Sequence, residues 1–174
     1  METQSAAVVA RSPGGALEVA LRTRAGSGAP AAAARVPQPF FEVVALMPAE
    51  LRAVCRVRGE LLRLLVGSGL SEVADAVVLG ASELMANAVT HGCRRQDPAQ
   101  FSLRVEHSRG RVRVEVGDPS RVRPFPRLAS DDSEGGRGLL LVAALADRWG
   151  VRLEPCGGKT VWLELDVPGK EAVS

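Results

Sequence analysis

Hydrophobic and polar positions change their period several times along the chain, and each change marks an expected element. Residues 40–46 are rich in strand-forming side chains and lead to Pro48, which predicts a first strand followed by a helix start. Between residues 49 and 66, leucines and valines recur at helical spacing with arginines on the other face, so we expect an amphipathic helix. Ser71 can cap a second helix that runs to Gly92.

The second half of the chain predicts more sheet than helix. Apolar and polar residues alternate at 101–107 and 111–116 around a Ser-Arg-Gly turn, which is typical of an antiparallel hairpin. Residues 119–135 hold prolines and aspartates and predict a loop long enough to act as a lid. The remaining expected elements are a helix from about 138 to 147 and strands at 149–154 and 160–167.

These elements together predict a two-layer α/β sandwich. Its sheet is expected to be mixed but mostly antiparallel, with about five strands covered on one face by three helices. We expect this domain to occupy residues 39–168. Residues 1–38 mix Ala, Gly, Ser, Pro and Arg without a sustained apolar period, so they predict a flexible arm, and residues 169–174 form a short tail.

Length and composition fit a single domain. The chain has 174 residues, of which 46% are hydrophobic, enough for one sizeable core but not for a second full domain. The longest clean apolar stretch, residues 138–146, is too short to cross a bilayer, which favours a cytoplasmic protein with no membrane association. Three cysteines without a CxxC pair favour reduced thiols over disulfides or a zinc site.

The formal net charge of +2 resides in the N-terminal arm, where residues 1–35 hold four arginines against two glutamates. The remainder of the chain is neutral, with two Trp, four Phe and no Tyr. It therefore lacks the basic stripe and the stacking platform of a nucleic-acid binder, and nucleic acid is not an expected partner.

Three polar residues lie four positions apart on the second predicted helix: Glu83, Asn87 and His91. Side chains at this spacing share one stripe of the helix surface. On one interpretation they form a solvated face, with His91 favoured by the helix dipole. On the other, the Glu83 carboxylate is a base and the Asn87 amide oxygen is a ligand for Mg²⁺ beside substrate phosphates.

A glycine-rich segment precedes the third predicted helix. Gly136, Arg137 and Gly138 stand directly before the apolar residues 139–142. Backbone N–H groups at such a helix N-terminus suit an anion such as a triphosphate. The same glycines also fit an ordinary turn, and no lysine follows them to make a Walker A motif.

Two further polar positions lie at strand ends. Asp118 ends the hairpin before Pro119, and Lys159 and Thr160 follow Gly158 into the last strand. Each of these positions, read alone, is most often a turn former. Their order relative to the two motifs above is what makes them informative.

Taken together and in this order, the motifs resemble the ATP-binding domain shared by histidine kinases, Hsp90, DNA gyrase and bacterial anti-sigma-factor kinases, the GHKL superfamily with its Bergerat fold. Residues 83–92 are similar to the N-box of the anti-sigma-factor serine/threonine kinases. Segments 114–120, 136–150 and 158–162 are also similar, and the resemblance covers about residues 40–167. The chain departs from the broader family at residues 118–120, where Asp-Pro-Ser replaces Asp-x-Gly and is expected to narrow the adenine pocket.

The resemblance implies ATP and Mg²⁺ as ligands. Glu83 would be the base that activates an attacking hydroxyl, and Asn87 would hold the Mg²⁺ ion that bridges the phosphates. Asp118 would accept a hydrogen bond from the adenine amine, and Thr160 would support the adenine edge.

The glycine-rich segment would serve the phosphates. Gly136 and Gly138 would let the lid backbone approach them, while Arg137 or Lys159 would balance charge on the transferred phosphoryl group. For His91, packing at the helix end fits at least as well as a phosphate contact.

The function implied by the resemblance is an ATP-dependent serine/threonine kinase that phosphorylates an antagonist protein and controls a sigma factor. Phosphorylation on histidine is disfavoured, because the chain before the pocket is short and holds no histidine before His91. Two alternatives stay open: a module that binds ATP and a partner without phosphoryl transfer, and a slow ATPase without a protein acceptor. A homodimer through the first helix, as in related kinases, is a further possibility.

Overall fold

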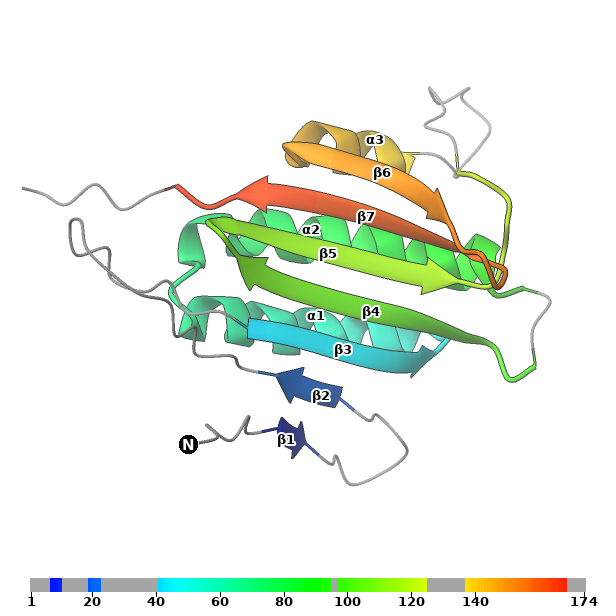
Figure 1. Ribbon diagram of the computed structural model, residues 1–174, viewed down its shortest axis with the longest axis horizontal. Coiled ribbons are helices and arrows are strands. Elements are labelled where there is room, and N and C mark those ends of the chain that lie inside the picture. Colours follow the sequence, from blue (N-terminus) through cyan, green and yellow to red (C-terminus); the bar gives the residue numbers. More distant parts are fainter. Residues whose placement is uncertain (1–6, 11–18, 23–40, 95–96, 125–136, 169–174) are drawn as a thin grey trace, which may run out of the picture.

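One open sheet backed by helices forms the described part of the chain (Figure 1). The computed structural model describes residues 7–10, 19–22, 41–94, 97–124 and 137–168. The helices are α1 Leu51–Gly67, α2 Ser71–Asn87 and α3 Arg137–Leu145, and a π-helical turn, η1 Ala88–Gly92, extends α2. The strands are β1 Ala7–Ala10, β2 Val19–Arg22, β3 Phe41–Pro48, β4 Gln100–Ser108, β5 Arg111–Asp118, β6 Arg148–Leu153 and β7 Lys159–Asp166.

The strands follow the order β1-β2-β3-β4-β5-β7-β6. All neighbouring pairs in the described sheet are antiparallel, so the sheet is not mixed as expected. Helices α1 and α2 lie side by side behind the sheet, and α3 packs along α2 near β6 (Figure 1). The predicted two-layer α/β sandwich is therefore confirmed, and the expected helices and strands lie within a few residues of their predicted bounds.

Two segments of the N-terminal arm form strands, whereas the sequence predicted a flexible segment throughout. Strand β2 pairs with residues 42–45 of β3, and β1 pairs with β2, so the sheet has seven strands rather than about five. Without them, β3 would be an edge strand with unpaired backbone N–H and C=O groups. The backbone of β2 pairs with these groups along residues 42–45 of β3. The remainder of the arm lies outside the described residues.

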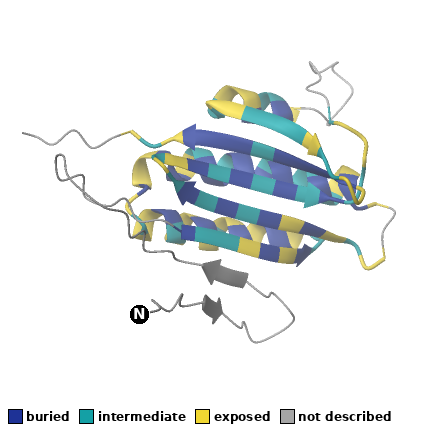
Figure 2. Ribbon diagram, in the orientation of Figure 1, coloured by how far each residue is buried: buried dark blue, intermediate teal, exposed yellow. Residues whose placement is uncertain are grey.

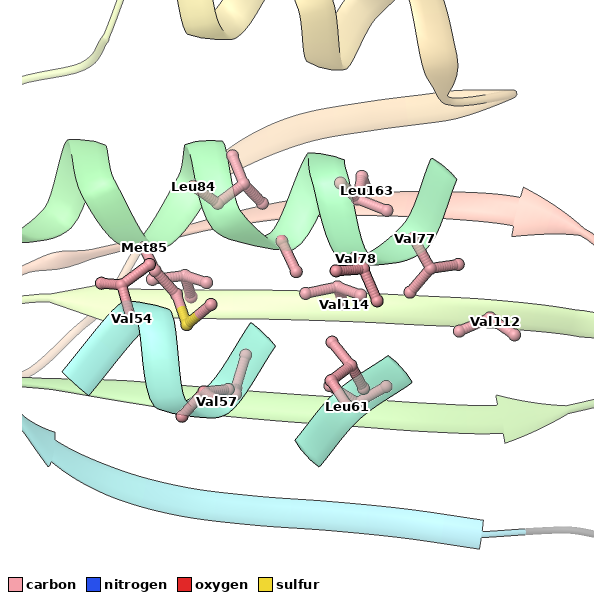
Figure 3. Packing of buried hydrophobic residues seen from close by; sticks show 14 of the residues in the cluster. Val54, Val57, Leu61, Val77, Val78, Leu84, Met85, Val112, Val114 and Leu163 are labelled. Atoms are coloured by element: carbon pink, nitrogen blue, oxygen red, sulfur yellow. The ribbon is translucent and has the colours of Figure 1, made fainter. Parts of the chain in front are cut away.

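Buried and less buried residues alternate along β4 and β5, so the two faces of the sheet differ in burial. In β5, every second residue from Val112 onward is buried, and Figure 2 shows the same alternation on β4, whereas most of β7 is buried. The buried residues face the apolar sides of α1 and α2, where Val57, Met85 and Val114 belong to one cluster (Figure 3). Burial of this cluster, at about 25 cal/mol per Å² of apolar surface, holds α2 in place along the sheet.

The segment Ser71–Gly92 is long and apolar enough to cross a membrane by length and composition, with a mean hydropathy of 1.3. Within the fold, 56% of its most apolar window is buried, and the helix packs against β5, β7, α1 and α3. These contacts are those of the central helix of a folded domain.

Candidate functional site

The C-terminal half of α2 meets the first turn of α3 at Gly138. A Cβ atom built on Gly138 would collide with Glu83 Oε2 and would lie 3.5 Å from Asn87 Nδ2. The sequence therefore places glycine where any larger residue would displace the Glu83 carboxylate and would touch the Asn87 amide. The structure thus brings together Glu83, Asn87 and Gly138, three residues predicted from two distant motifs.

A second close approach lies one turn beyond Asn87. In η1 the helix widens to π-helical geometry, a local change that frequently marks functional sites. Gly92, at the end of this turn, lies against the end of β5, because a Cβ atom at this position would collide with the carboxylate of Asp118. Gly92 is a site residue whose role the sequence did not reveal, although a glycine at a helix end is the signal that could have found it.

Asp118 is held in a defined position by hydrogen bonds and by an ion pair. Its Oδ1 atom accepts bonds from the backbone N–H of Ser120 at 2.9 Å and from Lys159 Nζ at 2.7 Å. Both charged side chains are buried, with 3% of the Asp118 side chain and 6% of the Lys159 side chain exposed. The pairing follows from the sheet register, which sets Asp118 opposite Lys159.

Lys159 does not lie where its predicted role beside the transferred phosphoryl group would require. Its ammonium group lies with Asp118, next to Gly92, whereas Glu83 lies about 13 Å further back along the helix axis. Lys159 therefore belongs to the end of the site where a base would be recognised and not to the phosphate end.

The position of Thr160 does not agree with its predicted role at the adenine edge. Successive side chains of a strand point to opposite faces, and Lys159 points toward α2, so Thr160 points to the open face of the sheet. There its Oγ1 donates a hydrogen bond to Glu154 Oε1 at 2.6 Å. Thr160 also lines an open groove of about 510 Å³ on that face, together with Val44, Leu46 and Arg104.

Of the remaining predicted site residues, two lie exposed at helix ends and one lies outside the described residues. Arg137 is exposed at the first position of α3, directly before Gly138. His91 is exposed in the last turn of η1, a position that fits both of its interpretations. Gly136 lies outside the described residues.

A buried thiol lies beside the Asp118 end of the site. Burial raises the pKa of Cys93, the negative charge of Asp118 raises it further, and Lys159 offsets part of the effect. The Sγ atom of Cys93 donates a hydrogen bond to the backbone oxygen of Gln100 at 3.2 Å. Cys93 is therefore a neutral packing residue of the site wall near physiological pH.

The family model of the histidine kinase-like ATPase domain matches residues 47–165. The chain belongs to this family. A search of curated proteins found no match to the chain. As a histidine kinase-like ATPase domain, the chain is an ATP-binding regulatory domain of the GHKL type, a class with ATP-dependent kinase or ATPase activity that typically binds ATP with Mg²⁺.

The site of this histidine kinase-like ATPase domain fits ATP with Mg²⁺. The polar side chains converge around Gly138, where a Cβ atom would fill the space. Within the described ranges, no three His, Cys, Asp or Glu side chains form a metal-ligand group. A Mg²⁺ ion at Asn87 would thus depend on phosphate oxygens and water for its other ligands, which is the usual pattern for Mg²⁺ in nucleotide sites.

Proposed function

We propose that the chain is a serine/threonine protein kinase of the anti-sigma-factor type, which phosphorylates an antagonist protein and thereby controls a sigma factor. The observation that supports this proposal most is the contact of Glu83 and Asn87 with Gly138 at the start of α3. It sets a carboxylate and an amide beside a helix N-terminus, where backbone N–H groups favour phosphate.

Bound ATP would supply the γ-phosphoryl group and leave as ADP, and the Mg²⁺ ion would offset negative charge on the phosphates. Glu83 would accept the proton of the attacking serine or threonine hydroxyl. Asn87 would orient the metal ion through its side-chain oxygen. The first turn of α3 would donate backbone hydrogen bonds to the phosphates, and Arg137 would add positive charge at that end.

Asp118 would recognise the base. Its two described hydrogen bonds both go to Oδ1, so Oδ2 is the oxygen that would accept a bond from the adenine amine. The separation of Asp118 from Glu83 along α2 supports this division, because a nucleotide has its base and its phosphates at opposite ends. The same α2 helix would then position both ends of one ligand.

A binding module without phosphoryl transfer is the second candidate. The observation that favours it is the Asp-Pro-Ser sequence at residues 118–120, which differs from the Asp-x-Gly of the wider family. Such a protein would bind ATP and a partner but would leave the partner unmodified.

Phosphoryl transfer separates the candidates. The full chain would be incubated with γ-labelled ATP, Mg²⁺ and a panel of small antagonist proteins, beside Glu83→Gln and the control Glu72→Gln, which changes an exposed carboxylate in the first turn of the same helix. The kinase proposal expects label on a serine or threonine of one partner, retained in Glu72→Gln and lost in Glu83→Gln. ATP binding without label on any partner would support the binding module, and phosphate release without a partner would indicate an ATPase.

The proposed kinase would act in the cytoplasm, where sigma factors and ATP are present together. Purifying the tagged full chain in the presence of ATP and identifying the retained proteins would test the partner assignment. We expect a sigma factor or its antagonist among the proteins retained by the wild-type chain. The Asn87→Ala variant would be treated in the same way, and the absence of both proteins from that sample alone would not contradict the assignment. Their absence from the wild-type sample would contradict it.

A further inference from the structure

The pair formed by Lys159 and Asp118 presents a hydrogen-bond donor beside an acceptor at the base end of the site. We propose that Lys159 is a base-specificity residue: its ammonium group donates a hydrogen bond to N1 of adenine while Asp118 accepts one from the adenine amine. This inference rests on the proposed binding of ATP. It assigns to Lys159 a role that neither the motif order nor the family match contains.

The chemistry of the two side chains matches the edge of adenine. The amine at C6 is a donor and the adjacent ring nitrogen N1 is an acceptor. A carboxylate accepts only, whereas a lysine ammonium has three donors and no acceptor. The described hydrogen bonds of Lys159 go to Asp118 Oδ1 at 2.7 Å and to the backbone oxygen of Ser120 at 3.3 Å, which use two of its three donors.

The ammonium group is held before any ligand arrives. Lys159 is buried and its strand is paired with β5. Gly158, with φ of +86°, brings the β7 backbone so close to Asp118 that a Cβ atom would lie 2.5 Å from the Asp118 carbonyl oxygen. A fixed, desolvated donor loses little conformational freedom on binding, and its hydrogen bond is stronger than it would be in water.

Guanine offers the reverse pattern at the corresponding positions. Its O6 atom is an acceptor and its N1–H group is a donor, so a guanine placed like adenine would set O6 against Asp118 and N1–H against Lys159. Both contacts would be repulsive, and specificity commonly depends on such unfavourable contacts as well as on favourable ones. The pair therefore selects adenine over guanine.

A purely structural ion pair is the competing explanation, and it makes a different prediction. Buried pairs of this kind often contribute little to function, and removing one partner leaves an uncompensated charge. If the pair serves the fold alone, the affinity of the site for a nucleotide will not depend on N1 of the base.

Nucleotide analogues test the inference on the unmodified chain. In the presence of Mg²⁺, calorimetry would compare ATP, 1-deaza-ATP, 7-deaza-ATP and GTP. We expect 1-deaza-ATP to bind at least about tenfold more weakly than ATP, as for loss of a hydrogen bond to a charged donor. The analogue 7-deaza-ATP, altered on the opposite edge, is expected to bind like ATP, and GTP to bind more weakly than ATP.

The outcomes separate the two proposals. Absence of binding by any adenine nucleotide would contradict the proposed function itself. Equal binding of ATP and 1-deaza-ATP, or binding of GTP as tight as that of ATP, would overturn the role of Lys159 while leaving ATP binding intact.

Variants then assign the effect to Lys159. In Lys159→Met, ATP and 1-deaza-ATP are expected to bind with equal affinity. Because this variant buries an unpaired Asp118 charge, the double variant Asp118→Asn/Lys159→Met provides a second sample without that charge, and it is expected to lose the preference for N1 as well. The control Thr160→Val, on the opposite face of the same strand, should keep the preference. A preference that persists in the lysine variants would show that another group contacts N1 and would overturn the inference.

Discussion

A single methyl group added at Gly138 should lower the rate of phosphoryl transfer while leaving the stability of the fold almost unchanged. In Gly138→Ala, the new Cβ atom would collide with Glu83 Oε2, the end of a flexible and half-buried side chain. Glu83 can turn away from it, so the full cost of overpacking, about 1–3 kcal/mol, does not apply. Alanine in the first turn of α3 also gains up to about 1 kcal/mol of helix propensity over glycine. We therefore expect the free energy of unfolding to change by less than about 1 kcal/mol.

The effect on phosphoryl transfer is expected to be much larger. Turning Glu83 away moves the proposed base by at least about 1 Å, and a misplacement of this size can lower a catalysed rate by about a hundredfold. Initial rates of label transfer from γ-labelled ATP to the antagonist protein would measure this loss. Urea unfolding of the same samples would measure stability.

Gly67→Ala is the matched control. Gly67 is the last residue of α1, and nothing lies within 4 Å of a Cβ atom built there. We expect both its stability and its transfer rate to stay close to those of the unmodified chain. A wild-type transfer rate in Gly138→Ala would refute the reasoning, as would an equal loss in Gly67→Ala.

Two further substitutions probe the other end of the site and the open face. In Gly92→Ala the new Cβ atom meets the Asp118 carboxylate, which is fixed and buried, so we expect a loss of about 1–3 kcal/mol in urea unfolding; a variant as stable as the unmodified chain would contradict this. Burial by itself raises the pKa of Glu164, but hydrogen bonds from Arg148 and Arg113 outweigh it and hold this pKa below its usual value. The stabilisation is therefore complete above the unfolded-state pKa of about 4.3 and is lost as pH falls through the lower folded-state pKa. Glu164→Gln should thus be less stable near pH 7 and should lose less stability on acidification below about pH 5, and parallel pH profiles for the two proteins would rule this out.

The elements and the phosphate end of the site could be predicted because their signals are local. The spacing of Glu83 and Asn87 fixes their common helix face, and the glycine-rich segment before residues 139–142 fixes where α3 starts. Their meeting at Gly138 followed from the order of the motifs in the family that the chain resembles. The structure confirms that contact.

The base end was harder to predict because it depends on pairing between distant strands. A shift of one residue in register exchanges the two faces of a strand, so the adjacent Lys159 and Thr160 could be assigned to opposite faces only from the pairing of β7 with β5. The π-helical turn before Gly92 likewise forms where the helix meets Asp118, at a separation in sequence that no local pattern reports. Strands β1 and β2 were missed because four-residue segments carry little periodicity and pair with an edge of β3 that the sequence does not display.

Calorimetric titration of the full chain with ATP tests the central claim most directly, namely that Glu83, Asn87 and Asp118 serve one nucleotide with its metal ion. The account predicts saturable binding in Mg²⁺ that weakens when the metal is chelated, and an Asn87→Ala variant whose weaker binding no longer responds to Mg²⁺. Absence of binding heat with the unmodified chain at saturating Mg²⁺, confirmed by equilibrium dialysis with labelled ATP, would contradict it.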